Sequence, residues 1–595
     1  MKRRSATAEP ASPQLTGRHA RAAKQGASPP PAPALPRASA APIGELLVAR
    51  KDVDPQLITE ALLQQSASGK RVGTLLVELG ALDDADLAEV LAEHFGLPVV
   101  DLRTETPLED AVALVPESLA RAHNCIPLWL NDAGALVVGV ADPTAELLQQ
   151  LTLHVGKPVL FAVAPAADVR KAIDTHYRSM SDIDTFVTAF QATSTTRKAV
   201  ALTSESTTED APVVQVVNRI ITQALRDRAS DVHIEPQDSR LRIRFRIDGA
   251  LHDVIALPED MAPALTSRLK IMAGMNIVER RRPQDGQIAM DVDGRSVDIR
   301  VATTGTIWGE KVVLRVLDKS RPLYKLNDLG MPKDTHETFS KLVRAPFGMV
   351  LCAGPTGSGK TTTLYATMSE INESQRNIMT IEDPVEYVFP SINQIQMNEQ
   401  AGLTFATGLK SILRQDPDVI LVGEIRDVET ARIATQSALT GHFVLSSLHA
   451  TDAVAALHRF LDMGIESFLI ASSVLGVVGQ RLVRRICTGC KTQYMPSVEE
   501  LSFYEEAGGT PKQDFFRGTG CNFCSNTGFS DRIGVYELLT ITPEIKRLVV
   551  GWATQDELRR MAVKQGMRTL RDEAIALVEQ DLTTVPEVIR HIYST

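Results

Sequence analysis

The second half of the chain alternates short, mostly apolar runs with segments of helical periodicity. Four such runs occupy residues 349–353, 377–381, 419–422 and 443–447. A short apolar run between helical segments is typical of a strand that is buried on both faces, as in a parallel sheet covered by helices. Residues 319–595 are therefore predicted to form an α/β domain.

The preceding region has a different pattern, in which one helix is followed by alternating strands. The expected elements are a helix over 212–225 and strands over 231–234, 241–246, 297–301 and 312–316. Asp248-Gly249 follows the second of these strands and is a typical hairpin turn. Residues 212–318 are therefore predicted to form an α+β domain.

The first part of the chain carries an internal repeat. Ile43-Gly44-Glu45-Leu46-Leu47 and Val72-Gly73-Thr74-Leu75-Leu76 each open a segment with helical apolar spacing, and the segments end near Gln65 and His94. We expect two copies of one small helical unit. Two strands are predicted after them, over 135–140 and 159–163, which gives a helical and mixed accessory domain over residues 42–178.

Polar stretches flank this accessory domain. Residues 1–41 are rich in Ala, Pro and Ser and cannot bury enough apolar surface to offset their conformational entropy, which predicts a disordered tail. On the other side a polar run over 193–210 interrupts the apolar pattern. We therefore expect a linker over residues 179–211.

Composition narrows the class of protein. The 595 residues carry a formal net charge of −10, whereas binding of nucleic acid needs Lys and Arg clusters that outweigh their acidic neighbours. No apolar stretch is long enough to span a membrane, and no apolar core of a secretory signal stands near the start. Six cysteines are too few for a disulfide scaffold in a chain of this length. These features predict a cytoplasmic protein that does not bind nucleic acid.

The first apolar run of the α/β domain leads into a glycine-rich turn, Gly354-Pro355-Thr356-Gly357-Ser358-Gly359-Lys360-Thr361. The strand before it and the helical segment that starts at Lys360-Thr361-Thr362 supply the context that a phosphate-binding loop requires. In such a loop backbone N–H groups surround the phosphates, Lys360 reaches the β- and γ-phosphates, and Thr361 offers a hydroxyl to Mg²⁺. We therefore predict a site for ATP and Mg²⁺.

Polar residues that suit hydrolysis follow the next apolar runs. Glu382 and Glu386 come after the second run, Glu424 after the third and His449 after the fourth. The carboxyl ends of neighbouring parallel strands converge on one ligand crevice, where carboxylates can hold Mg²⁺ or orient the attacking water. Each residue alone would more often be an ordinary polar residue, but their succession favours an ATP-hydrolysing site.

These motifs together resemble a known family. The phosphate loop, Ile381-Glu382-Asp383-Pro384-Val385-Glu386, the stretch from Asp418 to Asp427, and Thr440-Gly441-His442 through His449 resemble the type II secretion and type IV pilus assembly ATPases, the GspE/PulE family. The resemblance extends from about residue 42 to the C-terminus. It implies a multidomain α/β chain, with a RecA-like P-loop ATPase core preceded by a PAS-like α+β domain.

The resemblance also implies roles for the acidic residues and for the histidine. Glu386 is expected to be the general base for water, with Glu382 beside it. Glu424 is expected to act through Mg²⁺, and His449 to sense the γ-phosphate.

Arginines of the preceding domain complete the site in this family, and the matching positions are Arg300 and Arg315. Taken alone, both would be ordinary charges on a strand surface. A guanidinium at the γ-phosphate can raise the rate by roughly a thousandfold or more. Arg414 and Arg459 are further candidates for the same pocket.

Four of the six cysteines form two close pairs, Cys487-Thr488-Gly489-Cys490 and Cys521-Asn522-Phe523-Cys524. Two C-x-x-C pairs separated by a short insert suit four thiolates around a tetrahedral Zn²⁺ ion, and the alternative is four free thiols. We predict a structural zinc subdomain over about 485–535. Cys125 and Cys352 stand in apolar contexts and are expected in the core.

The repeated helical units resemble the N-terminal domain of the same family, of which some members bind cyclic di-GMP through paired Arg-Leu-Gly motifs. The second unit keeps Arg71, Gly73, Gly80 and Leu82, whereas Pro42, Lys51 and His94 depart from the pattern. An anionic dinucleotide needs an arginine and close backbone approach, so Arg71, Gly73 and Gly44 are the candidate contacts. Docking onto an inner-membrane partner is the preferred function of this domain.

Three functions are compatible with the motifs. The first is a cytoplasmic homo-hexameric ATPase that drives assembly of a type II secretion pseudopilus or a type IV pilus at the inner membrane. The second is a nucleic-acid translocase with a similar core, which the acidic charge and the zinc subdomain disfavour. The third is a signalling module with a vestigial ATPase, which the intact Lys360, Glu386 and Glu424 disfavour.

Overall fold

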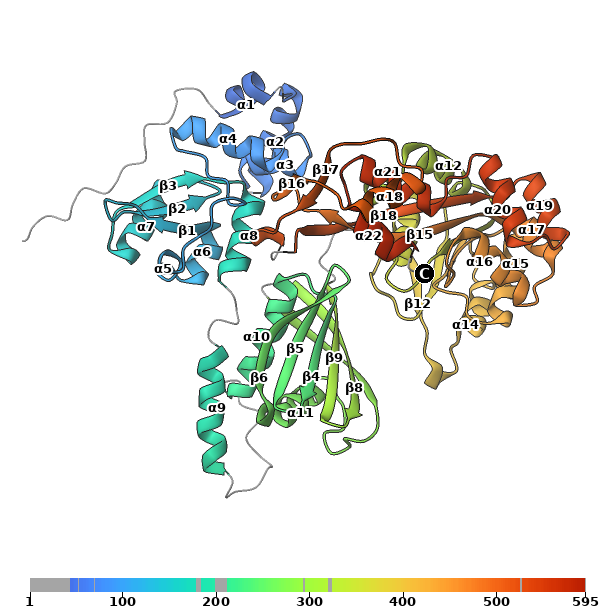
Figure 1. Ribbon diagram of the computed structural model, residues 1–595, viewed down its shortest axis with the longest axis horizontal. Coiled ribbons are helices and arrows are strands. Elements are labelled where there is room, and N and C mark those ends of the chain that lie inside the picture. Colours follow the sequence, from blue (N-terminus) through green and yellow to red (C-terminus); the bar gives the residue numbers. More distant parts are fainter. Residues whose placement is uncertain are drawn as a thin grey trace, which may run out of the picture.

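The computed structural model describes residues 43–51, 53–68, 70–177, 183–197, 211–292, 295–318, 324–524 and 527–593. The predicted tail over 1–41 and Pro42 lie outside these residues. Within the described ranges, every helix is too short or too polar to cross a membrane. Figure 1 shows three parts, coloured blue to cyan, green, and yellow to red along the chain.

The chain begins with two helix pairs, which correspond to the two copies of the sequence repeat. The first pair is α1 (Ile43–Lys51) and α2 (Pro55–Ser68), and the second is α3 (Val72–Glu78) and α4 (Asp84–Phe95). Their apolar faces share one small core that includes Leu47, Leu76 and Val90.

A small mixed layer follows the helix pairs. Its elements are α5 (Glu109–Val112), α6 (Glu117–His123), β1 (Cys125–Leu130), β2 (Leu136–Val140), α7 (Ala145–Val155), β3 (Val159–Val163) and α8 (Ala166–His176). Strand β2 pairs antiparallel with β1 and parallel with β3. The two predicted strands are present as β2 and β3, whereas β1 was not predicted. Cys125 is fully buried on β1, as expected of a core residue.

A helix, α9 (Ile183–Arg197), lies within the segment that the sequence predicts to be a linker. Its apolar residues Ile183, Phe186 and Phe190 pack on the core of the following domain beside α10 (Pro212–Arg226). The described part of the predicted linker therefore contributes to a folded core.

The middle domain is a six-stranded antiparallel sheet with helices on one side. Its elements are β4 (Asp231–Gln237), β5 (Arg240–Ile247), β6 (Ala250–Pro258), η1 (Glu259–Met261), α11 (Ala262–Met272), β7 (Gln284–Val292), β8 (Arg295–Thr306) and β9 (Gly309–Asp318), in sheet order β6-β5-β4-β9-β8-β7. Asp248 and Gly249 both have positive φ, 47° and 85°, as a tight hairpin turn requires.

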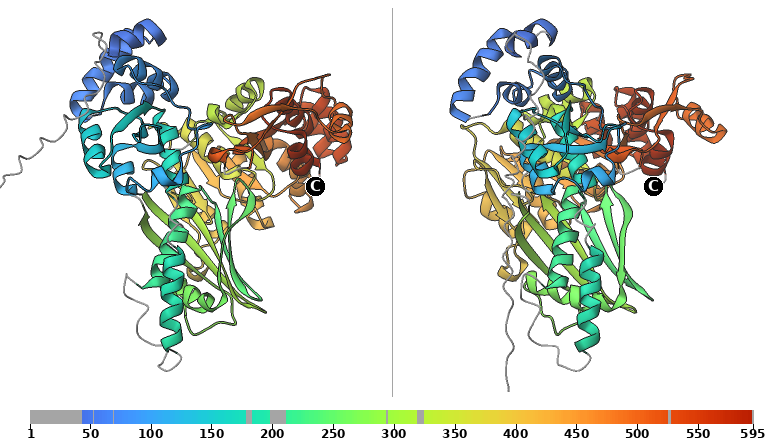
Figure 2. Two further views of the ribbon diagram at one scale, coloured as in Figure 1. Left: turned by 60° about the vertical axis from the view of Figure 1, so that its left-hand side comes forward. Right: turned by 90° about the vertical axis from the view of Figure 1, so that its left-hand side faces the viewer.

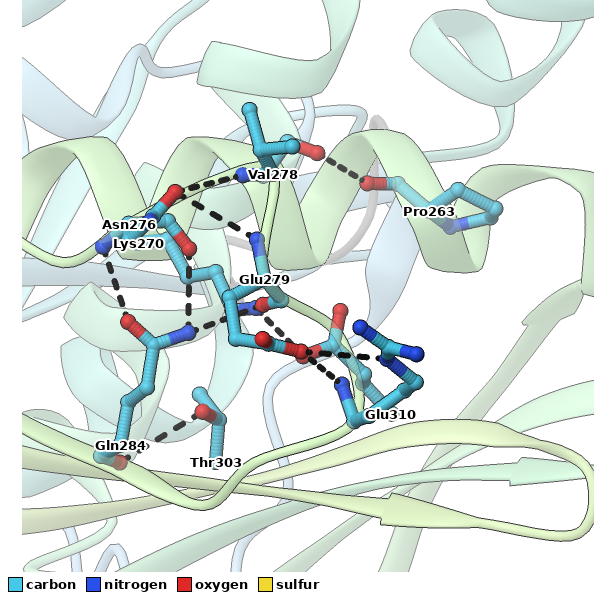
Figure 3. Close-up of polar contacts among 10 residues, drawn as sticks. Pro263, Lys270, Asn276, Val278, Glu279, Gln284, Thr303 and Glu310 are labelled. Atoms are coloured by element: carbon cyan, nitrogen blue, oxygen red, sulfur yellow. Dashed lines mark hydrogen bonds and ion pairs between the residues drawn. The ribbon is translucent and has the colours of Figure 1, made fainter.

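One end of this domain is held by a buried polar network (Figure 3). The Lys270 side chain, 1% exposed on α11, donates a hydrogen bond of 2.6 Å to the Glu279 carbonyl and forms an ion pair with Glu310. Gln284 donates to the carbonyls of Asn276 and Glu279 at 3.0 and 2.9 Å. Because Lys270 is buried with its counter-ion, the loop between α11 and β7 is tied to the sheet by paired polar groups.

The last part of the chain is built on a seven-stranded sheet. Its strands are β10 (Gly348–Ala353), β11 (Ile378–Glu382), β12 (Asn393–Gln396), β13 (Val419–Val422), β14 (Phe443–Leu448), β15 (Val474–Ile486) and β18 (Phe529–Thr540), in the order β12-β11-β13-β14-β10-β15-β18. All neighbours are parallel except β15 and β18. The four strands predicted from apolar runs are β10, β11, β13 and β14, and this topology confirms the α/β fold class.

Helices cover both faces of this sheet and extend beyond it. They are η2 (Leu326–Leu329), α12 (Lys333–Val343), α13 (Lys360–Ile371), η3 (Glu399–Ala401), α14 (Phe405–Ile412), α15 (Val428–Leu439), α16 (Ala453–Asp462), α17 (Ser467–Ser473), α18 (Val498–Glu506), α19 (Pro543–Val550), α20 (Gln555–Lys564), α21 (Leu570–Glu579), α22 (Val585–Val588) and η5 (Ile589–Tyr593). Separate cores on the two faces include Leu351 and Val350, which alternate along β10.

A small lobe projects from the far end of the sheet, between β15 and β18. It contains β16 (Lys491–Tyr494), β17 (Phe515–Gly518), η4 (Asn522–Cys524) and all four paired cysteines, and we call it the cysteine lobe. Figures 1 and 2 show that this lobe reaches toward α8 of the N-terminal part. The lobe is therefore placed between the accessory domain and the large sheet.

Candidate functional site

The glycine-rich turn joins β10 to the N-terminus of α13, as the phosphate-loop motif predicts. Gly357 and Gly359 have φ values of +77° and +88°, which other residues rarely adopt. At Gly354 a Cβ atom would lie 2.4 Å from Ser358 Oγ and 2.6 Å from the Gln480 carbonyl oxygen. The backbone can close into this loop only because glycine stands at these positions.

Lys360 is folded onto the loop that precedes it. Its Nζ donates to the carbonyls of Gly354 and Pro355 at 2.8 and 3.0 Å. Burial lowers the pKa of Lys360, and the charge of Glu424 is among the influences that oppose this shift. Thr361 is half-buried and Thr362 exposed in the first turn of α13, where the N–H groups of a helix N-terminus attract anions.

Gln480 supports the loop from β15, and no motif in the sequence points to it. This side chain on β15 is 1% exposed, and its Nε2 donates to the Ser358 carbonyl at 2.6 Å. The two residues are 122 positions apart in the chain. Only the pairing of β10 with β15 brings them together.

Glu424 and His449 lie together beside Lys360, at the ends of β13 and β14. His449 Nε2 is 3.4 Å from Glu424 Oε2. Burial and the positive charge of Lys360 lower the pKa of His449, while Glu424 opposes the shift. The imidazole is therefore held toward its neutral form, in which one ring nitrogen can accept and the other can donate a hydrogen bond.

Arg426 links this pair to the acidic segment after β11. It forms an ion pair with Glu424, and its Nη1 lies 4.0 Å from Asp383 Oδ2. The residue belongs to the motif that carries the family resemblance, but the sequence assigned it no role. Its two carboxylate partners follow β13 and β11, so it bridges the two strand ends predicted to converge.

Glu382 is buried, with both carboxylate oxygens occupied by protein donors. The donors are the hydroxyl of Tyr365, the hydroxyl of Thr380 at 2.6 Å and the amide of Gln394 at 3.2 Å. The Tyr365 hydroxyl also accepts from the Glu386 backbone N–H at 3.1 Å. Glu382 is therefore joined to the Glu386 backbone through the Tyr365 hydroxyl, and its charge adds to the burial that raises the pKa of the Glu386 carboxyl.

The pKa of the Glu386 carboxyl depends in part on arginines of the middle domain. Loss of hydration raises its pKa although the side chain still reaches solvent, and the charges of Arg300 and Arg315 oppose this rise. These arginines lie opposite each other in the register of β8 and β9. Arg315 Nε also donates to Asp231 Oδ1 at 3.1 Å, whereas burial lowers the pKa of Arg300 and the Glu386 charge opposes this shift. Within one chain the predicted arginines thus lie within electrostatic reach of the predicted base.

The remaining arginine candidates are placed differently. Arg459 on α16 donates through Nη1 to the His449 carbonyl and is next to the site. Arg414 is exposed after the end of α14 and has no ion pair with any residue in the described ranges. The structure therefore brings Arg459, but not Arg414, to the cluster around Glu424.

The four paired cysteines converge in the cysteine lobe. Their Sγ atoms all lie within 4.8 Å of one another, and three of the separations are 3.8, 3.8 and 3.7 Å. A tetrahedron with zinc–sulfur bonds of about 2.3 Å places its sulfurs about 3.8 Å apart. Backbone N–H groups of Gly520 and Gly528 donate to Cys490 and Cys524 sulfurs at 3.3 Å, which suits thiolates. The cluster therefore fits a structural zinc ion.

Comparison with known proteins identifies the family. Residues 206–590 match the type II/IV secretion system proteins, and residues 95–183 match the MshEN domain.

The chain belongs to the type II/IV secretion system protein family.

Relatives cover nearly the whole chain. It is 40% identical over 564 residues to the type IV pilus assembly ATPase PilB of Myxococcus xanthus, with 92% of this chain and 98% of that protein covered. It is also 40% identical over 560 residues to the type II secretion system protein E of Xanthomonas campestris pv. campestris, with the same coverage. The type II secretion system protein HxcR of Pseudomonas aeruginosa is 49% identical over 384 residues, with 64% of this chain and 78% of that protein covered. This member of the family is an ATPase, and the resemblance seen in the motifs is confirmed.

In this ATPase the candidate contacts for cyclic di-GMP have structural partners of their own. Arg71 forms an ion pair with Asp142 of the mixed layer. A Cβ atom at Gly73 would lie 2.6 Å from Leu87 Cδ1, and one at Gly44 would lie 3.5 Å from Ile58 Cγ2. The repeated glycines therefore stand where the helices of each pair approach closely, and the MshEN match begins at Phe95, the last residue of α4.

Proposed function

We propose that this ATPase couples ATP hydrolysis to the assembly of a type II secretion pseudopilus or a type IV pilus, as a cytoplasmic homo-hexamer bound to an inner-membrane platform. The observation that carries the proposal is the 40% identity to a pilus assembly ATPase and to a secretion protein E, in both cases over 98% of the relative. Because the two identities are equal, they support the shared function and do not favour either client.

The phosphate loop supports ATP binding in a defined orientation. The triphosphate would lie against the loop N–H groups and the Lys360 ammonium, and Thr361 and Glu424 are the groups that would hold Mg²⁺. When bound, Mg²⁺ neutralises charge on the β- and γ-phosphate oxygens. His449, next to Glu424, would report whether the γ-phosphate is present.

Glu386 is the proposed general base. A carboxyl whose pKa is raised takes a proton from the attacking water more readily near neutral pH. Arg300 and Arg315 would stabilise the negative charge of the transferred phosphoryl group. Because both arginines belong to the middle domain, hydrolysis depends on how this domain is placed against the large sheet, which is the basis for mechanical output.

The experiment measures ATP turnover of the purified protein. Glu386→Gln and Arg315→Ala should each lower kcat, the arginine change by on the order of a thousandfold. Matched controls are Glu370→Gln, which affects an ion pair with Arg344, and Arg242→Ala, whose partner Asp253 lies on the same sheet as Arg315. Near-normal turnover in both site variants would show that Glu386 is not the general base and that Arg315 does not stabilise the transferred phosphoryl group.

The client is tested in cells. A strain that carries Glu386→Gln in place of the natural gene should lose either surface pili or an extracellular protein, and the loss identifies the machine. If both are retained in the presence of the inactive protein, the assembly function is wrong. A nucleic-acid translocase would instead show ATP turnover stimulated by DNA, which the net charge of −10 disfavours.

For the accessory domain we propose docking onto an inner-membrane partner, with cyclic di-GMP as a second candidate ligand supported by the MshEN match. Calorimetry of the full chain with cyclic di-GMP tests the ligand. Heat of binding that is lost in Arg71→Ala would support it, and the absence of heat would remove it.

A further inference from the structure

The two cysteine pairs present corresponding residues to the accessory domain. Each pair has the pattern Cys-x-x-Cys, and the residue just before the second cysteine is Gly489 in one pair and Phe523 in the other. Both of these residues contact the N-terminal part of the same chain. The contacts lie on the surface of the cysteine lobe, outside the nucleotide site.

Phe523 is inserted into the core of the mixed layer. It is 9% exposed and clusters with buried residues of β1 to β3 and α8, although it belongs to the short turn η4 of the lobe. The Lys171 ammonium on α8 lies 5.2 Å from the centroid of its ring. A phenylalanine on a four-cysteine turn would be exposed without this domain, so the contact removes a large apolar group from water.

Gly489 makes room for the stem of Arg103. A Cβ atom at Gly489 would lie 3.4 Å from the Cβ and Cδ atoms of Arg103. The Arg103 guanidinium is held by Asp168 on α8, with an Nε–Oδ2 distance of 3.2 Å. Asp168 and Lys171 are three residues apart on one helix, so α8 organises the contacts with both cysteine pairs.

We propose that the cysteine lobe is a docking site for the accessory domain, and that its metal sets the spacing of the two contacts. Cys487 and Cys521 are 34 residues apart in sequence, and the sulfur cluster and the β16–β17 pairing hold the two pairs together. When the metal leaves, the cysteines take up protons and are no longer held by a common ion. Metal loss would then leave only the β16–β17 pairing to keep Gly489 and Phe523 at their present spacing. The proposal rests on zinc occupancy and does not depend on which machine the ATPase serves.

The accessory domain has a second attachment, and this attachment determines which measurement is informative. Arg226 on α10 forms an ion pair of 2.7 Å with Glu117 and donates to the Tyr177 carbonyl at 3.2 Å. Loss of the lobe contact therefore need not release the whole domain. The protection of the α8 amides against hydrogen exchange is therefore the quantity that reports loss of the lobe contact.

The test is hydrogen exchange measured by mass spectrometry on the full chain, together with zinc content per chain. Phe523→Ala should retain zinc and increase the exchange rate of α8 amides by roughly tenfold, because the opening of α8 is no longer opposed by the lobe. The matched control is Phe516→Ala, which removes a phenylalanine of the same lobe that also has a lysine over its ring, Lys491 at 4.8 Å. This control should leave the exchange rate of the α8 amides unchanged.

Two further measurements keep the proposal open to refutation. Gly489→Val, which keeps all four cysteines, should increase exchange in the same helix, and so should removal of zinc from the unmodified protein. Wild-type exchange of α8 in Phe523→Ala and Gly489→Val would overturn the docking contact. Wild-type exchange of α8 in the zinc-free protein would overturn the role of the metal. Loss of zinc from Phe523→Ala would show that the domain contact holds the metal in place, which also overturns the proposal that the metal sets the spacing of the contacts.

Discussion

Replacement of Gln480 tests whether the phosphate loop is supported from β15. Gln480→Met keeps a side chain of similar length but removes the amide that donates to the Ser358 carbonyl at 2.6 Å. The residue is 1% exposed, so water cannot readily replace the lost donor. Loss of a buried hydrogen-bond partner costs about 1–3 kcal/mol. If this cost falls on the loop conformation that binds phosphate, the Kd for ATP rises by roughly 5- to 150-fold, because about 1.4 kcal/mol corresponds to a factor of ten.

Titration with a fluorescent ATP analogue measures this change. Gln493→Met is the matched control, since Gln493 is an exposed glutamine of β16 that donates to Asp514 in the cysteine lobe. Thermal unfolding of the same samples shows whether the cost appears in the fold as well as in the affinity. An affinity within twofold of the unmodified protein, together with an unchanged Tm, would refute the support that we assign to Gln480.

Three further changes probe the site and the fold. Arg300→Ala removes a positive charge that opposes the raised pKa of Glu386, so that pKa should rise further. The acid limb of the pH–rate profile of the residual turnover should therefore move to higher pH, and an unshifted profile would contradict the coupling between Arg300 and Glu386. Tyr365→Phe removes the hydroxyl that joins Glu382 to the Glu386 backbone and should lower kcat more than tenfold with little change in KM; equal kcat would exclude a positioning role for this hydroxyl. Lys270→Met leaves Glu310 without its buried cation and should lower the unfolding free energy by about 3–5 kcal/mol, whereas adding Glu310→Gln should recover much of the loss in a denaturant titration.

The sequence predicted the elements whose signals are local. The apolar run over 159–163 coincides with β3, and the turn from Gly354 to Thr361 joins a strand to a helix as its glycines require. Arg300 and Arg315 were found through the family motif, and their pairing follows from the register of β8 and β9.

Other features depend on contacts between distant segments. Glu382 follows an apolar strand like any surface acid, and only the folded chain supplies Tyr365 and Gln394 as its partners. Gln480 is an isolated amide in an apolar strand, with no motif around it. Helix α9 lies in a stretch rich in Thr, Ser and Gln, and its few apolar residues become informative only when the core beside α10 is known.

Strand β15 connects two regions that have been treated separately. It is 13 residues long, carries Gln480 beneath the phosphate loop, and ends at Ile486, next to Cys487, the first cysteine of the cluster. Its pairing with β18 continues from Gly476 to Ile486, and the seven residue-to-residue steps from Gln480 to Cys487 span about 23 Å in extended form. Strand β15 therefore joins the nucleotide site to the cysteine lobe through one paired strand of the large sheet. The nucleotide site and the cysteine cluster that carries Phe523 are thus connected through this strand, by a route separate from the chain segment that joins the domains.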